Sequence, residues 1–169
     1  DVPEFLDVEI CNHVQVSMKE AMASNDRESW LQAIEDEFRS LLEHDVFEEV
    51  DEHQVDKSKL LSMQILLNRK DCGRFKCRGV CNGSRQNSET YNEVYAPVAK
   101  LCNLRILLRL CSHFGYAINQ YDIKTAFLQA EVDTDMYVKC PPLWRDRFRT
   151  PYLRLKRALY GLKQSPSLF

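Results

Sequence analysis

The stretch NQYDIKTAFL, residues 119–128, places one acid, Asp122, directly after the run 116–121 and follows it with a turn. We predict that residues 116–121 form a strand that ends at Asp122. A carboxylate at a strand end can hold a divalent metal ion, and Phe127, five residues later, can wall a small-ligand pocket. The preceding residues are interpreted as the scaffold that supports this stretch.

Composition indicates a soluble protein of one domain, or one lobe of a larger one. The chain has 169 residues, of which 44% are hydrophobic and 28% are charged. No window approaches the roughly 18 apolar residues of a membrane span. The first residues also lack the basic and apolar segments of a secretory signal. We therefore expect an intracellular protein, cytoplasmic or nuclear, with no membrane partner.

The seven cysteines are an odd number and are scattered through segments that resemble core, which favours free thiols in a reducing compartment. Cys72, Cys77 and Cys81 lie close together, so a zinc site has to be weighed. Their spacing contains no CxxC pair, and no histidine lies near them in sequence. A structural zinc site is therefore disfavoured.

Charge is distributed unevenly along the chain. Residues 1–56 carry 17 acidic and 3 basic residues, whereas residues 139–169 carry 1 acidic and 8 basic residues. A basic rear half suits a polyanion, because phosphate neutralisation needs clustered lysine and arginine. A solvated charged surface explains the same counts equally well.

Hydrophobic periodicity predicts two long helices. The first begins near Asp26 and fades near Glu43, and the second is stopped by Gly115. The first stripe is assigned to the core and consists of Trp30, Ala33, Ile34, Phe38, Leu41 and Leu42. The second stripe consists of Leu101, Leu104, Leu107, Leu108, Cys111 and Phe114.

Strands are predicted over residues 46–50, 60–67, 136–139 and 152–155, and a proline near the chain's end can open a helix. Turn residues at 71–73 predict a β-hairpin. Its second arm alternates so that Arg74, Lys76 and Arg78 share one face. Such a row suits a triphosphate or a nucleic-acid backbone, but on its own the pattern slightly favours an exposed edge strand protected from aggregation.

An ordered set of segments resembles the reverse transcriptase of copia-type retrotransposon polyproteins. The matching segments are residues 30–37 (WLQAIEDE), 73–78 (GRFKCR), 95–100 (YAPVAK), 122–128 (DIKTAFL), 136–138 (MYV) and 159–166 (LYGLKQSP). The resemblance implies an α+β fold: the fingers and an incomplete palm of a right-hand polymerase, with an antiparallel sheet and packed helices. It implies an N-terminal extension over residues 1–20 and the reverse transcriptase domain over residues 21–169.

The resemblance implies DNA synthesis from dNTPs on an RNA or DNA template. Asp122 matches the first metal-binding acid, Ile123 the residue whose backbone carbonyl adds a ligand, and Phe127 the aromatic that blocks a ribose 2′-hydroxyl. Two Mg²⁺ ions at such a site require hard oxygen ligands, which explains an aspartate. The other matches are Lys76, Arg78, Tyr160 and Gly161 for the nucleotide, and Arg74 and Lys163 for nucleic acid.

The implied partners are a template–primer, a dNTP and the remainder of a Pol polyprotein. The Tyr-x-Asp-Asp hairpin that carries the family's other metal-binding carboxylates is missing from this sequence. We therefore expect a truncated domain that binds Mg²⁺ weakly and is inactive alone. Its Asp122 strand would keep an unpaired edge, which predicts self-association.

Two alternatives remain: a nucleic-acid-binding fragment without catalysis, and a relic without a present role.

Three departures from the family pattern resemble the losses of a decaying copy. Residues 79–82 replace an apolar pair, a small residue and a lysine; no tryptophan stands near Gln64; and Leu143 occupies a usual glycine position.

Overall fold

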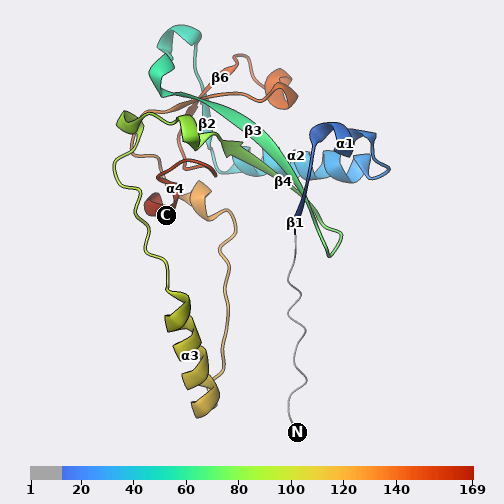
Figure 1. Ribbon diagram of the computed structural model, residues 1–169. Helices are drawn as coiled ribbons and strands as arrows, with labels where there is room; N and C mark the ends of the chain where they lie inside the picture. Colours follow the sequence, from blue (N-terminus) through green and yellow to red (C-terminus); the bar gives the residue numbers. More distant parts are fainter. Residues whose placement is uncertain (1–12) are drawn as a thin grey trace.

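The computed structural model describes residues 13–169 of the chain. The strands are β1 (His13–Val16), β2 (Phe47–Glu49), β3 (Leu60–Lys70), β4 (Phe75–Cys81), β5 (Tyr137–Lys139) and β6 (Tyr152–Leu155). The helices are α1 (Met18–Ala23), α2 (Arg27–Glu43), α3 (Leu101–Phe114) and α4 (Ser165–Leu168). In Figure 1, α2 lies behind the sheet and α3 stands apart at the end of two long connections.

The sheet is organised around β3, which hydrogen-bonds to β1, β4 and β5. The order is β1-β3-β5-β6-β2, with β4 also paired to β3, and only the β3–β5 pairing is parallel. The fold is therefore mixed, with a mostly antiparallel sheet, as expected. The strands predicted over residues 46–50, 60–67, 136–139 and 152–155 are confirmed. The sequence analysis assigned no element to residues 13–16, which form β1.

Helix α2 covers the sheet with one apolar face, as its periodicity predicts. Its buried residues are Trp30, Ile34, Phe38 and Leu41. The Trp30 ring packs edge-on against Phe75 of β4 with centroids 4.7 Å apart. The prediction that Leu42 joins this face is wrong, because its side chain is 49% exposed. Leu42 follows Leu41 by one residue, and that step turns the side chain about 100° away from the face.

The predicted hairpin is confirmed, with Gly73 in its turn at φ +78°. Strand β4 alternates as expected, so Cys77, Gly79 and Cys81 are buried while Lys76 and Arg78 face the other side. Two N–H groups of β4 find acceptors outside the ladder: that of Gly79 donates to Glu37 Oε1 at 2.9 Å, and that of Cys81 to the Tyr160 carbonyl at 2.8 Å. Part of this edge is thereby closed to a further strand.

The segment at Tyr160 and Gly161 crosses the end of β4 at very short range. A Cβ built on Gly161 would lie 2.1 Å from the carbonyl oxygen of Cys81, and one built on Gly83 would lie 2.0 Å from the carbonyl oxygen of Gly161. Gly161 also has a φ of +91°. Glycine is therefore required here both for space and for backbone conformation.

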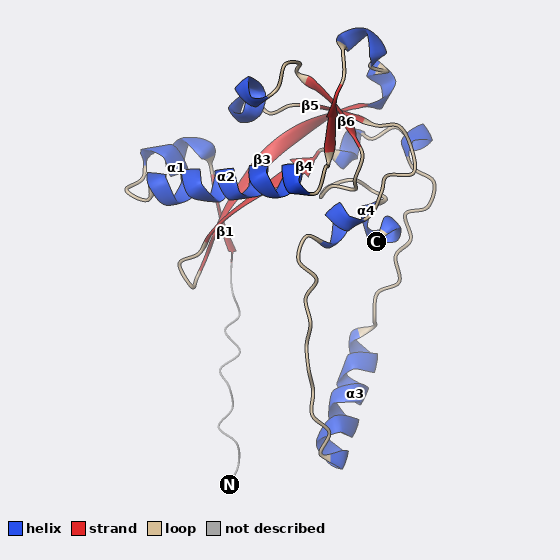
Figure 2. Cartoon of the chain, turned by 180° about the vertical axis from the view of Figure 1, so that it is seen from behind, coloured by secondary structure: helices blue, strands red, loops and turns tan. Residues whose placement is uncertain are grey.

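Residues 94–123, called the arm below, leave the body of the protein (Figures 1 and 2). Helix α3 begins and ends where predicted, and Gly115 caps it in the left-handed conformation. None of its residues is buried. The strand predicted over residues 116–121 is wrong, since these residues pair with no strand among residues 13–169. An apolar extended segment becomes a strand only where a second segment supplies hydrogen bonds.

The described cysteines are free, as expected, and Cys11 lies outside the described residues. Cys77 and Cys81 point into the core, where burial raises the pKa of each thiol to about 12, while Cys72 is exposed at the hairpin turn. The two buried thiols, Cys77 and Cys81, act as small apolar packing groups. Within residues 13–169, no helix is both long and apolar enough to cross a membrane.

The crossing at Gly161 can be tested with three alanine substitutions. We expect Gly161→Ala to lower the free energy of unfolding by about 3 kcal/mol or more, because strain at positive φ and displacement of the Cys81 carbonyl add together. Gly73→Ala carries a similar positive φ with no atom within 4 Å of its Cβ, so it isolates the strain at about 1 kcal/mol. Gly83→Ala isolates the contact, because its φ is not positive. Urea unfolding measures all three, and equal losses for Gly161→Ala and Gly73→Ala would contradict the close crossing.

Candidate functional site

Arg78, Phe127 and Tyr160, from three distant parts of the sequence, meet at one place. The Phe127 ring lies edge-on to the Tyr160 ring with centroids 5.0 Å apart, and the Arg78 guanidinium lies 5.7 Å from the centroid of the Tyr160 ring. Arg78 comes from β4, Phe127 from the 3-10 turn Ala126–Gln129, and Tyr160 from the loop that crosses β4. We call these three residues the arginine–aromatic cluster. All three were predicted site residues.

The cluster suits a ligand that combines a flat or apolar part with an anion. An arginine presents donors in a planar fork that matches carboxylate and phosphate oxygens. The two rings offer apolar faces and edges against which a sugar or a base can pack. All three residues are half-buried, so their side chains are both supported and accessible.

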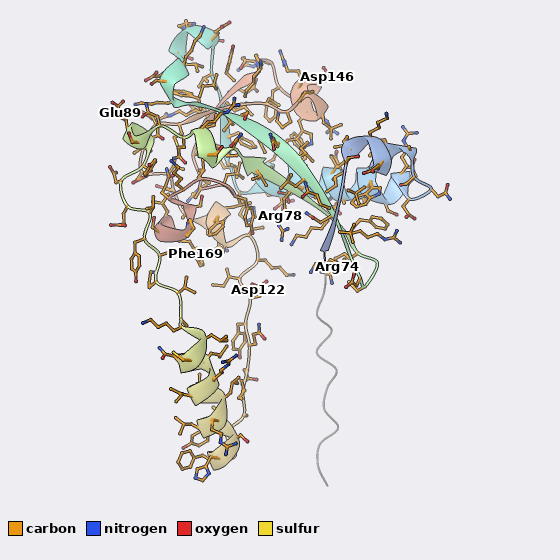
Figure 3. All side chains as sticks on the ribbon, in the orientation of Figure 1. Arg74, Arg78, Glu89, Asp122, Asp146 and Phe169 are labelled. Atoms are coloured by element: carbon orange, nitrogen blue, oxygen red, sulfur yellow. The ribbon has the colours of Figure 1, made fainter. Side chains whose placement is uncertain are left out.

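Lys76 adds a second cation two residues before Arg78 on the same face of β4. Partial burial lowers the pKa of Lys76, and the nearby charges of Arg78 and Lys70 lower it further. The lysine is therefore in a locally positive region that an anion would stabilise. Arg74 is exposed beside the hairpin turn, away from the cluster (Figure 3).

Glu37 is an acidic residue whose charge interacts with those of Lys76 and Arg78. Burial raises its pKa, while its hydrogen bond from Gly79 and the charges of Lys76 and Arg78 oppose that rise. The Glu37 carboxyl group therefore accepts a hydrogen bond from the backbone of β4. Glu37 was not a predicted site residue, although it lies in the matching run 30–37.

A buried polar network fixes the loop that carries Tyr160. Gln86 Nε2 donates to Gln164 Oε1 at 2.7 Å, and Gln164 Nε2 donates to the Thr90 carbonyl at 2.9 Å. Gln86 Oε1 accepts the Lys163 backbone N–H at 3.0 Å. Gln86, Thr90 and Gln164 are each at most 5% exposed. Paired buried amides of this kind are costly to leave unpaired, so the network holds the loop in one place.

The sequence analysis missed the role of Gln86 and Gln164. Gln164 stands in the matching segment LYGLKQSP, but nothing in the sequence pairs it with a residue 78 positions away. Lys163 was predicted to contact nucleic acid. Its Nζ donates to the Gln86 carbonyl and to the Tyr91 hydroxyl, both at 3.3 Å, so its ammonium group also braces this network.

Asp122 and Ile123 lie on the arm rather than at a strand end. Both are exposed, and among residues 13–169 no hydrogen bond or ion pair involves the Asp122 carboxylate. The described residues also contain no group of three or more histidine, cysteine, aspartate or glutamate side chains placed to hold a metal. Figure 3 shows Asp122 on the long connection below the body. The structure thus assembles the predicted nucleotide residues and leaves the predicted metal ligands apart from other carboxylates.

Comparison with known proteins adds a family match. Residues 46–169 match the family described as reverse transcriptase (RNA-dependent DNA polymerase). The chain is 39% identical over 95 residues to the retrovirus-related Pol polyprotein from transposon RE1 of Arabidopsis thaliana. The matched residues make up 55% of the chain and 6% of that polyprotein.

Two further relatives match over longer stretches. The chain is 28% identical over 156 residues to the Pol polyprotein from transposon TNT 1-94 of Nicotiana tabacum, covering 89% of the chain and 12% of the polyprotein. It is 30% identical over 144 residues to the transposon Ty1-DR4 Gag-Pol polyprotein of Saccharomyces cerevisiae, and this match covers 83% of the chain and 9% of the polyprotein. The chain therefore spans a small part of these relatives. No solved structure matches it.

Proposed function

The chain belongs to the reverse transcriptase (RNA-dependent DNA polymerase) family found in copia-type retrotransposon polyproteins, and from this membership we propose that it forms the nucleotide-contacting part of an RNA-directed DNA polymerase. We assign the β3–β4 hairpin to the polymerase fingers, and the segment around Asp122 with the following 3-10 turn to the palm. The remainder of the Pol polyprotein, a template–primer and a dNTP are the proposed partners.

The observation that supports this proposal is the arginine–aromatic cluster. Its guanidinium and the neighbouring Lys76 offer cations to the triphosphate of a dNTP, and its rings offer surfaces to the sugar and base. In the proposed complex, Phe127 stands beside the sugar, where its ring excludes a ribose 2′-hydroxyl. Tyr160 and Gly161 lie beneath the nascent base pair, and Arg74 and Lys163 contact nucleic acid.

The fit of a metal is incomplete. Asp122 and the Ile123 carbonyl supply the hard oxygen donors that Mg²⁺ prefers, but a single carboxylate does not hold two such ions. Among the described residues, Asp122 belongs to no group of three or more histidine, cysteine, aspartate or glutamate side chains that could hold a metal ion. We therefore derive no catalytic step through a metal, and we propose that this chain alone binds Mg²⁺ weakly and does not polymerise DNA.

The nucleotide proposal is tested by titrating the chain with dATP and with inorganic tripolyphosphate. We expect Arg78→Ala to weaken binding of both ligands about tenfold, because it removes charge-assisted hydrogen bonds to phosphate. Lys19→Ala, an exposed lysine on α1, is the matched control and should leave affinity unchanged. Equal affinities for the wild-type chain, Arg78→Ala and Lys19→Ala would reject the cluster as a triphosphate site.

The proposal that this chain alone does not polymerise DNA is tested by primer extension with Mg²⁺ and all four dNTPs on RNA and DNA templates. We expect no extension by this chain alone, because one carboxylate cannot stabilise both the attacking and the leaving oxygen through two ions. Extension above background that is lost in Asp122→Asn would contradict this expectation. Binding of dATP without extension is the combination that the proposal predicts.

A further inference from the structure

Thr125 is a strained residue just after the arm. Its φ is +52°, in the left-handed region, which a β-branched residue adopts only where its surroundings impose it. Thr125 caps the turn Ala126–Gln129, and its carbonyl oxygen accepts the Leu128 N–H at 2.9 Å. The change of chain direction between Ile123 and Phe127 is therefore made at Thr125.

The imidazole of His44 lies against this strained residue. His44 follows α2 as its C-cap, with Nδ1 2.7 Å from the Ser40 carbonyl oxygen and Nε2 3.0 Å from Thr125 Oγ1. A carbonyl oxygen only accepts hydrogen bonds, so Nδ1 carries a hydrogen and donates it. The Thr125 hydroxyl also lies 2.7 Å from the Lys124 carbonyl oxygen, to which it donates.

The protonation state of His44 decides how many of these bonds form together. A neutral ring with hydrogen on Nδ1 leaves Nε2 as an acceptor, so the single Thr125 hydroxyl hydrogen serves either Nε2 or the Lys124 carbonyl. An imidazolium donates from Nε2 to Oγ1, which frees the hydroxyl to donate to Lys124. The protonated ring thus completes an unbroken chain of bonds from Ser40 to Lys124.

The arm itself has few ties to the body. Across residues 13–169, the hydrogen bonds of residues 94–123 reach no farther than Glu93. At its outgoing end, Ser167 Oγ donates to the Glu93 carbonyl at 2.6 Å. At its returning end, the His44–Thr125 contact joins the chain to α2. His44 is therefore well placed to control where the arm's last residues point.

We propose that His44 is a positioning residue: its bond to Thr125 holds the left-handed turn that joins Asp122 and Ile123 to Phe127 of the arginine–aromatic cluster. The purpose of this turn rests on the proposed function, whereas the bond can be measured without it. His44 does not touch the nucleotide residues, so it acts only through Thr125.

Amide exchange measured by NMR tests this role, with the Leu128 amide as reporter of the turn. We expect His44→Phe to lower the Leu128 protection factor about tenfold, since one hydrogen-bonded contact is lost. His44→Gln should restore most of the protection, because its amide Nε2 can donate to Thr125 Oγ1. His53→Phe, an exposed histidine elsewhere, is the matched control.

An unchanged Leu128 protection factor in His44→Phe, or equal losses of protection in His44→Phe and His44→Gln, would overturn the proposal. Amides of the core residues Leu41 and Leu153 report whether each variant folds. If His44→Phe does not fold, Thr125→Val, which removes the hydroxyl partner of His44, decides instead by the same loss of Leu128 protection. Failure of triphosphate binding alongside the expected exchange results would reject the nucleotide function and leave the His44 bond standing.

Discussion

The loop at Tyr160 and Gly161 crosses the end of β4 so closely that no side chain fits between the two backbones. The Cys81 N–H donates to the Tyr160 carbonyl at this crossing, which fixes the loop against the strand. Tyr160 is thereby brought beside Arg78, and the Phe127 ring packs against it. The geometry of the predicted nucleotide residues is thus set by a backbone contact rather than by their own side chains.

The molecule divides its proposed site into a fixed part and an extended part. Buried hydrogen bonds among Gln86, Thr90 and Gln164 fix the loop that carries Tyr160 to the body of the protein. Asp122 and Ile123 belong to the arm, which is joined to the body at its two ends. Helix α3 on this arm is exposed on all sides although most of its residues are apolar. A helix of this composition is typical of a buried position.

Local signals in the sequence predicted most elements well. The spacing of Trp30, Ile34, Phe38 and Leu41 gave the face of α2, and turn residues gave the hairpin, because both depend on neighbours in sequence. The strand expected over residues 116–121 failed since strand formation needs a partner that local pattern cannot identify. The same limit hid β1, which is defined by pairing with β3.

For the candidate site, the sequence indicated individual residues but not the long-range contacts between them. The family resemblance identified Arg78, Phe127 and Tyr160, although no local pattern indicates that they touch. It did not identify the Gln86–Gln164 pair, because a buried amide pair joins positions 78 residues apart. The contact of His44 with Thr125 was missed for the same reason, as it spans 81 residues. Long-range polar contacts are therefore the part of this site that the structure adds.

The central claim is that the fold brings the arginine–aromatic cluster together before any ligand binds. The direct measurement is the set of nuclear Overhauser effects among the side chains of Arg78, Phe127 and Tyr160 in the unliganded chain. The account predicts cross-peaks between the Phe127 and Tyr160 rings and between Arg78 and Tyr160. Cross-peaks between Trp30 and Phe75, whose centroids lie 4.7 Å apart, serve as the control for a folded core. A chain that shows the control cross-peaks without those of the cluster would contradict it.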